Sequence, residues 1–315
     1  MEKYDLFIIG AGAAGIAAAK AAWKETVSHK IQGCKRDENG ESFKIALCDK
    51  GSLAGGVLRQ CFHTGFGHQM TGVEYADQLL EDFPEEITCF FNTTVLKITE
   101  EKTLLLSSAE KGLQQIAFEH LILASGCMEV PAGALPIAGT RPEGIYTAGE
   151  MQAMVHLEGF LPEGPVVILG SGDLGLIMAE TIRSAGIQVT LVEQKDYCGG
   201  LVRNRKPVET GAVELITSAS IRTICGEKSL ESVILAEGPE KTEGRCLPCK
   251  TMLIAAGLRP DRQLVRGLEN KEWLTLCGNC RQVHPMVEGV VAEGKEAGVQ
   301  AVKQLTRARQ GSAQE

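Results

Sequence analysis

Twice along the chain, a short apolar run ends in a glycine-rich turn that is followed by a segment with helical character. The first run, Leu6–Ile9, leads into the turn 10–15 (GAGAAG), and the second, 165–169, leads into the turn 170–175 (GSGDLG). Apolar runs of this length without polar residues predict strands that are buried on both faces. Each place therefore predicts a strand, a tight turn and the start of a helix.

The segments after the two turns predict helices, 15–23 by its alanine content and 176–183 by its amphipathic pattern. In this setting the spacing G-x-G-x-x-G is typical of dinucleotide binding. The first glycine turns the chain, the second lets the backbone approach a diphosphate, and the third lets helix and strand pack closely. The anion lies on unpaired N–H groups at the positive helix end. The predicted nucleotide-binding glycines are Gly10, Gly12, Gly15, Gly170, Gly172 and Gly175.

An acidic residue ends the next apolar run in each half of the chain. Asp49 follows 44–48, and Glu193 follows 188–192. Glu193 is close to the spacing of ~20 residues typical of a ribose-binding acid, whereas Asp49 is displaced by a polar insertion, 24–42. We expect both carboxylates to accept hydrogen bonds from ribose hydroxyls. An isolated strand-end acid is more often only solvated, but the position here favours the ribose role.

The order of the remaining runs is similar in the two halves. Short strand-like runs follow each nucleotide unit, and an apolar run ending in glycine closes each half, at 121–126 and at 251–257. A third apolar stretch, 273–279, precedes a predicted helix over 285–305. The pattern predicts an α/β fold with two Rossmann-like domains, each a β-α-β unit with a β-meander, the second inserted into the first. The predicted domains are residues 1–140 with 260–315, and residues 141–259.

Composition and charge exclude several classes of protein. The 315 residues carry a formal net charge of −8 and only 5% aromatic residues, which argues against nucleic acid as a partner. No stretch approaches the ~20 apolar residues of a membrane span. The eleven cysteines are an odd number in a chain too large to need disulfides, so we expect reduced thiols and a cytoplasmic location.

Two dinucleotide modules in this interrupted order resemble the two-domain flavoprotein reductases, and the length resembles the thioredoxin-reductase-like type. The resemblance implies FAD in the first domain and a nicotinamide nucleotide in the second. It also implies that Gly126, Gly278 and Asn279 contact the flavin nucleotide, with the Asn279 amide in place of the family's usual carboxylate. By the same resemblance His284 lies near the flavin ring; the alternative is a polar cap near a helix end.

A longer set of motifs is similar to a narrower subgroup. The motifs are GGVLRQCFHTGFG at 55–67, TGVEYA at 71–76, PIAGTRP at 136–142 and CGN at 277–279. The subgroup comprises FAD/NAD-dependent oxidoreductases encoded beside glycerol-3-phosphate-dehydrogenase-like proteins, and is similar to the α-subunits of opine oxidases, hydroxyproline dehydrogenases and sarcosine oxidase. This resemblance implies a partner subunit, either a flavoprotein dehydrogenase or an iron–sulfur protein, and leaves a homo-oligomer open.

The cysteines do not fit a disulfide reductase, which needs a pair near the flavin. Cys61 stands alone after Gly55-Gly56. Cys61 and His63 share a face if this segment is extended, so they are the candidate catalytic residues, as a thiolate beside an imidazolium. The alternative is a buried cysteine that lines the flavin pocket without taking part in chemistry.

Two further cysteine pairs, 246/249 and 277/280, raise the question of a zinc site. The gap between the pairs is longer than in zinc ribbons, and the pairs belong to different modules. We therefore predict no metal. A redox-active dithiol of Cys277 and Cys280 near the flavin is a second, less favoured interpretation.

These observations predict a FAD-dependent oxidoreductase that exchanges hydride between NAD(H) and flavin and passes electrons to or from its partner. Glu193 favours NAD over NADP because a 2′-phosphate would meet a carboxylate, a preference that Lys195 softens. Two alternatives stay open. One is a non-catalytic electron-transfer or scaffold subunit with a structural adenine nucleotide in the second site, for which Ile177, where many disulfide reductases carry Glu, is the argument. The other is a stand-alone amine or hydroxy-acid dehydrogenase or oxidase.

Overall fold

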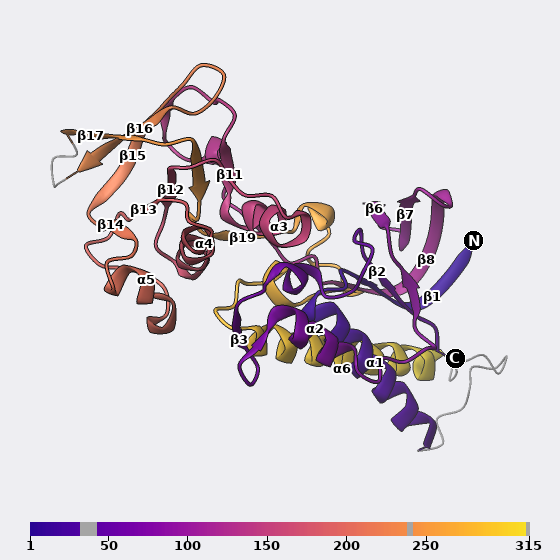
Figure 1. Cartoon of the computed structure of the whole chain (residues 1–315). Coiled ribbons are helices and arrows are strands. Elements are labelled where there is room, and N and C mark those ends of the chain that lie inside the picture. The colour runs from indigo at the N-terminus through magenta and orange to yellow at the C-terminus, as the bar shows by residue number, and fades with distance from the viewer. Residues whose placement is uncertain (32–42, 238–241, 313–315) are drawn as a thin grey trace. The chain divides into compact units, whose positions relative to one another are not determined.

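The chain divides into two compact units in the computed structural model, which describes residues 1–31, 43–237 and 242–312 (Figure 1). The first unit comprises Met1–Met128 and Pro260–Glu315, and the second comprises Glu129–Arg259. The second unit is thus one continuous piece of chain that interrupts the first. Each unit is built on its own parallel strands, which confirms the predicted α/β fold class.

A seven-stranded mixed sheet forms the centre of the first unit. Its strands are β1 (Glu2–Ile9), β2 (Ile45–Cys48), β5 (Thr88–Phe90), β6 (Thr93–Ile98), β7 (Thr103–Ser108), β8 (Gly112–Leu123) and β20 (Leu274–Leu276). The order is β5-β2-β1-β8-β7-β6, with β20 paired to the end of β8. The strands β5, β2, β1, β8 and β20 pair in parallel, whereas β6, β7 and β8 form the antiparallel meander.

Strand β1 is buried on both faces, as its uninterrupted apolar run predicts. Leu6 and Ile8 point into one core, with apolar residues of the helices, and Phe7 and Ile9 point into a second core, with residues of the meander. Because side chains alternate along a strand, four consecutive apolar residues supply two cores at once.

In the described part of the first unit, the α-helices are α1 (Ala13–Ile31), α2 (Gly72–Leu80) and α6 (Val287–Ser312). Helices α1 and α6 lie side by side (Figure 1). A Cβ on Gly294 would lie 2.2 Å from the Ala14 oxygen, and a Cβ on Gly298 would lie 2.2 Å from the Ala18 oxygen. Gly294 and Gly298, one helical turn apart, therefore allow the backbones of α6 and α1 to come into contact. Helix α6 thus packs directly against the helix that follows the first glycine turn.

The described strands of the second unit form mainly a five-stranded and a four-stranded sheet. One is fully parallel in the order β11-β18-β12-β13-β14, and its strands are β11 (Ile145–Thr147), β18 (Thr251–Ile254), β12 (Val166–Leu169), β13 (Val189–Val192) and β14 (Glu214–Ile216). The other consists of β10 (Ala138–Gly139), β15 (Ala219–Cys225), β16 (Ser232–Glu237) and β17 (Thr242–Pro248). The helices are α3 (Ala148–Glu158), α4 (Asp173–Ser184) and α5 (Lys206–Glu209).

The remaining described strands pair as two short ribbons outside these sheets. They are β3 (Thr64–Phe66) with β4 (Met70–Thr71), and β9 (Cys127–Glu129) with β19 (Leu258–Pro260).

The first crossing between the units lies at 128/129, earlier than the predicted boundary at 140/141. Residues 129–140 belong to the second unit because Ile137 packs in its core and β10 pairs with β15. The predicted insertion at 24–42 lies mostly outside the described residues, apart from the end of α1. Within the described residues, no helix combines the length and hydropathy needed to cross a membrane.

Candidate nucleotide-binding sites

The first glycine turn (10–15) joins the end of β1 to the start of α1. Gly10 has a φ of 102°, and a Cβ there would lie 2.3 Å from the Ala124 oxygen. A Cβ on Gly15 would lie 1.7 Å from the Gly10 oxygen, so only glycine lets the helix start this close to the strand. At Gly12, no heavy atom of the described residues would come within 4 Å of a Cβ. The middle glycine faces open space, which suits a backbone that a ligand approaches closely.

Asp49, directly after β2, fixes this turn from the neighbouring strand. Its Oδ2 accepts the Ala11 N–H at 2.6 Å, and its Oδ1 accepts the Gly51 N–H at 2.7 Å. A carboxylate oxygen can accept two hydrogen bonds, so each oxygen has capacity for one more donor. Asp49 therefore holds the glycine turn and retains the capacity to accept ribose hydroxyls.

The second glycine turn (170–175) repeats this geometry between β12 and α4. Gly170 has a φ of 105°, and a Cβ there would lie 2.4 Å from the Ala255 oxygen. A Cβ on Gly175 would lie 2.2 Å from the Gly170 oxygen, whereas one on Gly172 would meet no described atom within 4 Å. All three glycines thus play the same steric roles as their counterparts in the first unit.

Glu193, directly after β13, is the counterpart of Asp49. Its Oε2 accepts the Ser171 N–H at 2.9 Å and the Ser171 hydroxyl at 2.7 Å, and its Oε1 accepts the Lys195 N–H at 3.0 Å. Burial favours the neutral acid, but the hydrogen bonds from Lys195 and Ser171 outweigh it and lower the pKa of Glu193. The carboxylate is therefore held in its charged form at the end of the strand.

A Gly-Gly loop after each carboxylate is a second repeated feature, which the sequence analysis missed. In the first Gly-Gly loop (54–61), the Gly55 N–H donates to the Ala11 oxygen at 2.8 Å. In the second Gly-Gly loop (198–205), the Gly199 N–H donates to Ser171 Oγ at 2.8 Å. Each loop closes on the residue between the first two glycines of its turn. The signal was in the sequence, since GGVLR and GGLVR follow the two acids at the same distance.

The turn after β20 brings several predicted residues together at the start of α1. A Cβ on Gly278, whose φ is 67°, would lie 2.7 Å from the Ala14 Cβ. The Asn279 Oδ1 accepts the His284 N–H at 3.0 Å, so this amide is partly used within the turn itself. The placement agrees with a role beside the first glycine turn, although the contact of Asn279 with a ribityl chain stays a prediction.

Glu293 of α6 organises this turn, and sequence analysis did not single it out. Its Oε2 accepts the Gly278 N–H at 2.7 Å, and its Oε1 pairs with Arg281 at 2.7 Å. The His284 Nε2 lies 3.1 Å from Glu293 Oε2, an ion-pair distance without hydrogen-bond geometry. The carboxylate thus holds the turn and places a negative charge beside the His284 ring.

Gly126 follows the end of β8, and its counterpart Gly257 follows the end of β18. Both have a positive φ, 80° and 107°, and a Cβ on either would meet no atom of the described chain within 4 Å. Each unit therefore presents a second open glycine at the carboxyl end of a strand that pairs with the strand before its glycine turn. Parallel α/β sheets bind ligands at this edge.

Cys61 ends the first Gly-Gly loop and is buried. Its thiol donates to the Val57 oxygen at 3.3 Å, and a Cβ on Gly72 would lie 2.5 Å from the Cys61 Cβ. Burial raises the pKa of Cys61 to about 12, which favours the neutral thiol. The ring of His63 lies 5.3 Å from that of Phe66. These surroundings favour the packing interpretation over the thiolate–imidazolium pair, whose role in catalysis stays a prediction.

The remaining cysteine pairs show no redox or metal geometry. No two cysteines of the described chain are at disulfide distance. Cys277 and Cys280 are buried, burial raises the pKa of both thiols, and the Cys280 Sγ donates to the Leu123 oxygen at 3.0 Å. Cys246 and Cys249 belong to the second unit, so the two pairs lie in different units. Among the described side chains, no group of three or more acids, histidines and cysteines is arranged to hold a metal ion.

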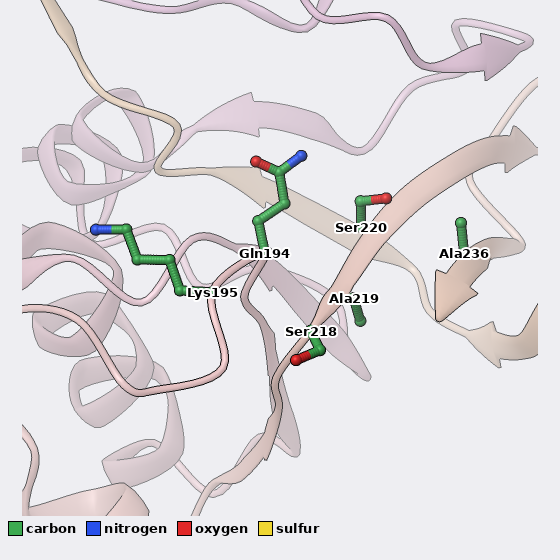
Figure 2. Close-up of a pocket in the computed structure, with 6 residues that line it drawn as sticks. All are labelled: Gln194, Lys195, Ser218, Ala219, Ser220 and Ala236. Atoms are coloured by element: carbon green, nitrogen blue, oxygen red, sulfur yellow. The ribbon is translucent and has the colours of Figure 1, made fainter. Parts of the chain in front are cut away.

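A pocket of about 320 Å³ opens directly after Glu193 in the second unit (Figure 2). The segment after β13 forms one wall of the pocket, and the start of β15 forms another. The Ser218 N–H donates to the Lys195 oxygen at 2.8 Å and holds these two segments together. Figure 2 shows the side chains of Gln194 and Lys195 pointing in different directions from the end of β13. The lining residues are Gln194, Lys195, Ser218, Ala219, Ser220 and Ala236.

The family profile of the pyridine nucleotide-disulphide oxidoreductases matches residues 4–276. The match covers both glycine turns, both carboxylates and the strands that carry them. The chain therefore belongs to this family, whose members bind FAD and NAD(P).

Particular relatives agree with this assignment. The HcnB subunit of hydrogen cyanide synthase from Pseudomonas protegens is 24% identical over 84% of this chain and 59% of its own length. An opine oxidase subunit of Agrobacterium tumefaciens is 25% identical over 84% of this chain and 54% of its own length. The chain thus spans somewhat more than half the length of these curated relatives. The thioredoxin reductase of Lactococcus lactis has the same fold, with a TM-score of 0.74 at 18% identity over 96% of this chain and 99% of that one.

Proposed function

We propose that the protein exchanges hydride between NAD(H) and FAD and passes the electrons to or from a partner flavoprotein or iron–sulfur protein. The observation that carries the proposal is the repeated site, in which two glycine turns of one geometry each have their own carboxylate. When bound, the flavin and the nicotinamide supply the redox chemistry, and the chain supplies binding and orientation.

The first unit fits FAD. Gly10, Gly12 and Gly15 would hold the diphosphate at the start of α1, and Asp49 would accept the ribose hydroxyls. The open positions at Gly12 and Gly126 support this fit, because a side chain at either would fill the space that a ligand needs. The turn 278–284, fixed by Glu293, lies against the same helix start and would contact the rest of the flavin nucleotide.

The second unit fits a nicotinamide nucleotide, and its charges favour NAD over NADP. Gly170, Gly172 and Gly175 would hold the diphosphate, and Glu193 the ribose. The hydrogen bonds to Glu193 keep it ionised, and an ionised acid repels a 2′-phosphate. The Lys195 ammonium lies 5.2 Å from the centre of the Tyr197 ring, so this cation is partly engaged by an aromatic side chain.

A partner protein is supported by the relatives and by the cysteines. HcnB and the opine oxidase relative are, by name, subunits of larger enzymes. The described chain offers no redox disulfide to receive electrons from the flavin. We therefore propose a second redox protein as the acceptor or donor of the electrons.

The test is an anaerobic visible spectrum of the purified protein during titration with NADH and, separately, NADPH. We expect sub-millimolar NADH to bleach the flavin band and NADPH to do so poorly. A flavin spectrum indifferent to both would exclude direct nicotinamide chemistry and support the scaffold alternative. Bleaching by an amine or hydroxy acid alone would support a stand-alone dehydrogenase, and failure to bind FAD would refute the assignment of the first unit.

A further inference from the structure

The two glycine turns differ in the residues between the glycines. The first carries alanine at positions 11, 13 and 14, whereas the second carries Ser171, Asp173 and Leu174. Asp173 is the first residue of α4. The unpaired N–H groups of a helix start are the ones that bind an anionic ligand. The second turn thus has a carboxylate where the first has only the methyl group of Ala13.

The Asp173 side chain is fixed by the second Gly-Gly loop. Its Oδ1 accepts the Leu201 N–H at 2.7 Å and the Asn204 Nδ2 at 2.6 Å. A Cβ on Gly200 would lie 3.1 Å from this same Oδ1, so the loop backbone passes directly beside it. The loop is braced in turn by Arg205, which donates to the Gly200 oxygen at 2.7 Å. The negative charge therefore stays in the first turn of α4.

A carboxylate in this place competes electrostatically with a bound diphosphate. The N-terminal end of a helix carries a partial positive charge, which an acidic side chain in the first turn already neutralises in part. A diphosphate placed on the same turn gains less from the helix and is repelled by the carboxylate. In the first unit, Ala13 introduces neither effect.

We propose that Asp173 sets the affinity of the second site, keeping the nicotinamide nucleotide weakly bound and exchangeable while the first site retains FAD. The inference rests on the proposed function, because it concerns the nucleotide held by the second glycine turn. It gives a reason why FAD would stay bound as a cofactor whereas the nicotinamide nucleotide would leave after each turnover. Asp173 acts through its charge, and its hydrogen bonds to the loop are a separate, structural contribution.

The variant Asp173→Asn separates charge from structure. An asparagine Oδ1 can accept from Leu201 and Asn204 as before, so the loop contacts persist while the charge is lost. We would titrate the full-length, FAD-loaded protein with ADP by calorimetry, since FAD occupies the first site. We expect the variant to bind ADP about three- to tenfold more tightly, in line with a charge at a helix end. Adenosine, which has no phosphate, should bind wild type and variant equally within about twofold.

Equal or weaker binding of ADP by a folded Asp173→Asn protein would overturn the inference, as would an equal gain for adenosine. If this variant does not fold, the pair Ala13→Asp and Ala13→Asn puts the same question to the first unit. There we expect the Asp variant to retain FAD at least about threefold less tightly than the Asn variant, and equal retention would refute the inference. If NADH bleaches the flavin of the wild type but Asp173→Asn does not change the affinity for ADP, this inference alone is refuted. A wild type that neither binds ADP nor is bleached would sink the proposed function with it.

Discussion

Asp49 and Glu193 occupy equivalent places in two repeats of one structural plan. Each accepts the backbone N–H of the residue between the first two glycines of its turn, at 2.6 Å and 2.9 Å. Each also accepts the N–H of the residue two positions further along the chain. Because the two carboxylates belong to different units, one nucleotide site can be perturbed while the other stays intact.

Replacing Glu193 by glutamine should weaken the second site and spare the first. The amide Nε2 of the introduced glutamine would face the N–H donors of Ser171 or Lys195, and the ribose would lose a charged acceptor. We expect the apparent Kd for NADH to rise about tenfold, since a hydrogen bond to a charged group contributes roughly 1.5–3 kcal/mol. Flavin content per chain, measured after denaturation, should not change. A loss of FAD in this variant would contradict the independence of the two sites.

The lowered pKa of Glu193 predicts a pH dependence of stability. A carboxylate whose pKa is depressed by folding binds fewer protons in the folded state, so its contribution is present above its ordinary value of 4.5. This contribution is lost as the pH falls through the lower, folded pKa. The difference in unfolding free energy between wild type and Glu193→Gln should therefore be largest near neutral pH and shrink below about pH 4.5. Urea unfolding of both proteins along this pH range is the measurement, and a difference that does not vary with pH would refute it.

Alanine substitutions at two glycines of the second turn should have different effects, one on NADH binding and the other on stability. A Cβ at Gly172 meets open space, so Gly172→Ala should change stability by less than about 0.5 kcal/mol yet weaken NADH binding about tenfold or more. A Cβ at Gly175 would lie 2.2 Å from a backbone oxygen, so Gly175→Ala should destabilise the second unit by about 2 kcal/mol or more. Thermal unfolding with and without NADH distinguishes the two effects. Gly133→Ala, where a Cβ also meets no described atom, is the control for the substitution itself.

The sequence predicts the parts of this protein that depend on short, regular patterns. The run Leu6–Ile9 had to be a strand covered on both faces, and the spacing of Gly10, Gly12 and Gly15 required a strand, a turn and a helix. The same reasoning found the second copy of the motif and the carboxylate after each next strand. These features are local, and each follows from the steric needs of a few neighbouring residues.

Other features depend on contacts between distant segments. In the sequence, nothing distinguishes Glu293 from the other acidic residues of its amphipathic helix. Only the fold shows that its carboxylate accepts the Gly278 N–H. The predicted boundary at 140/141 and the crossing at 128/129 differ because Ile137 packs in the core of the second unit, a contact that the sequence pattern does not show. Helix α3 was overlooked although Thr147 and Glu150 form a capping box, a signal that the sequence does carry.

Cys61 gives a direct test of the two interpretations of the flavin-side cysteine. Its buried, neutral thiol predicts that Cys61→Ala costs about 1–2 kcal/mol of stability and changes the rate of flavin bleaching by NADH less than about twofold. Because the pKa is raised to about 12, alkylation of Cys61 in the folded protein should be slow at neutral and mildly alkaline pH. Mass spectrometry after iodoacetamide treatment measures this. A drop in bleaching rate of about a hundredfold at normal flavin content would instead establish the thiolate–imidazolium pair.

Glu293 should be required for the first site to retain its flavin, because it holds the Gly278 N–H and lies 3.1 Å from His284. In Glu293→Gln, the amide can keep one hydrogen bond to the turn but loses the negative charge that lies beside His284 and pairs with Arg281. We expect FAD to bind about five- to tenfold more weakly, which equilibrium dialysis against FAD would measure. Glu296→Gln is the matched control, since Glu296 is an exposed acid of the same helix that accepts a hydrogen bond from the Gln300 amide, four residues further along the helix. Equal loss of FAD in both variants would point to a general effect of charge on α6 and not to the turn that Glu293 fixes.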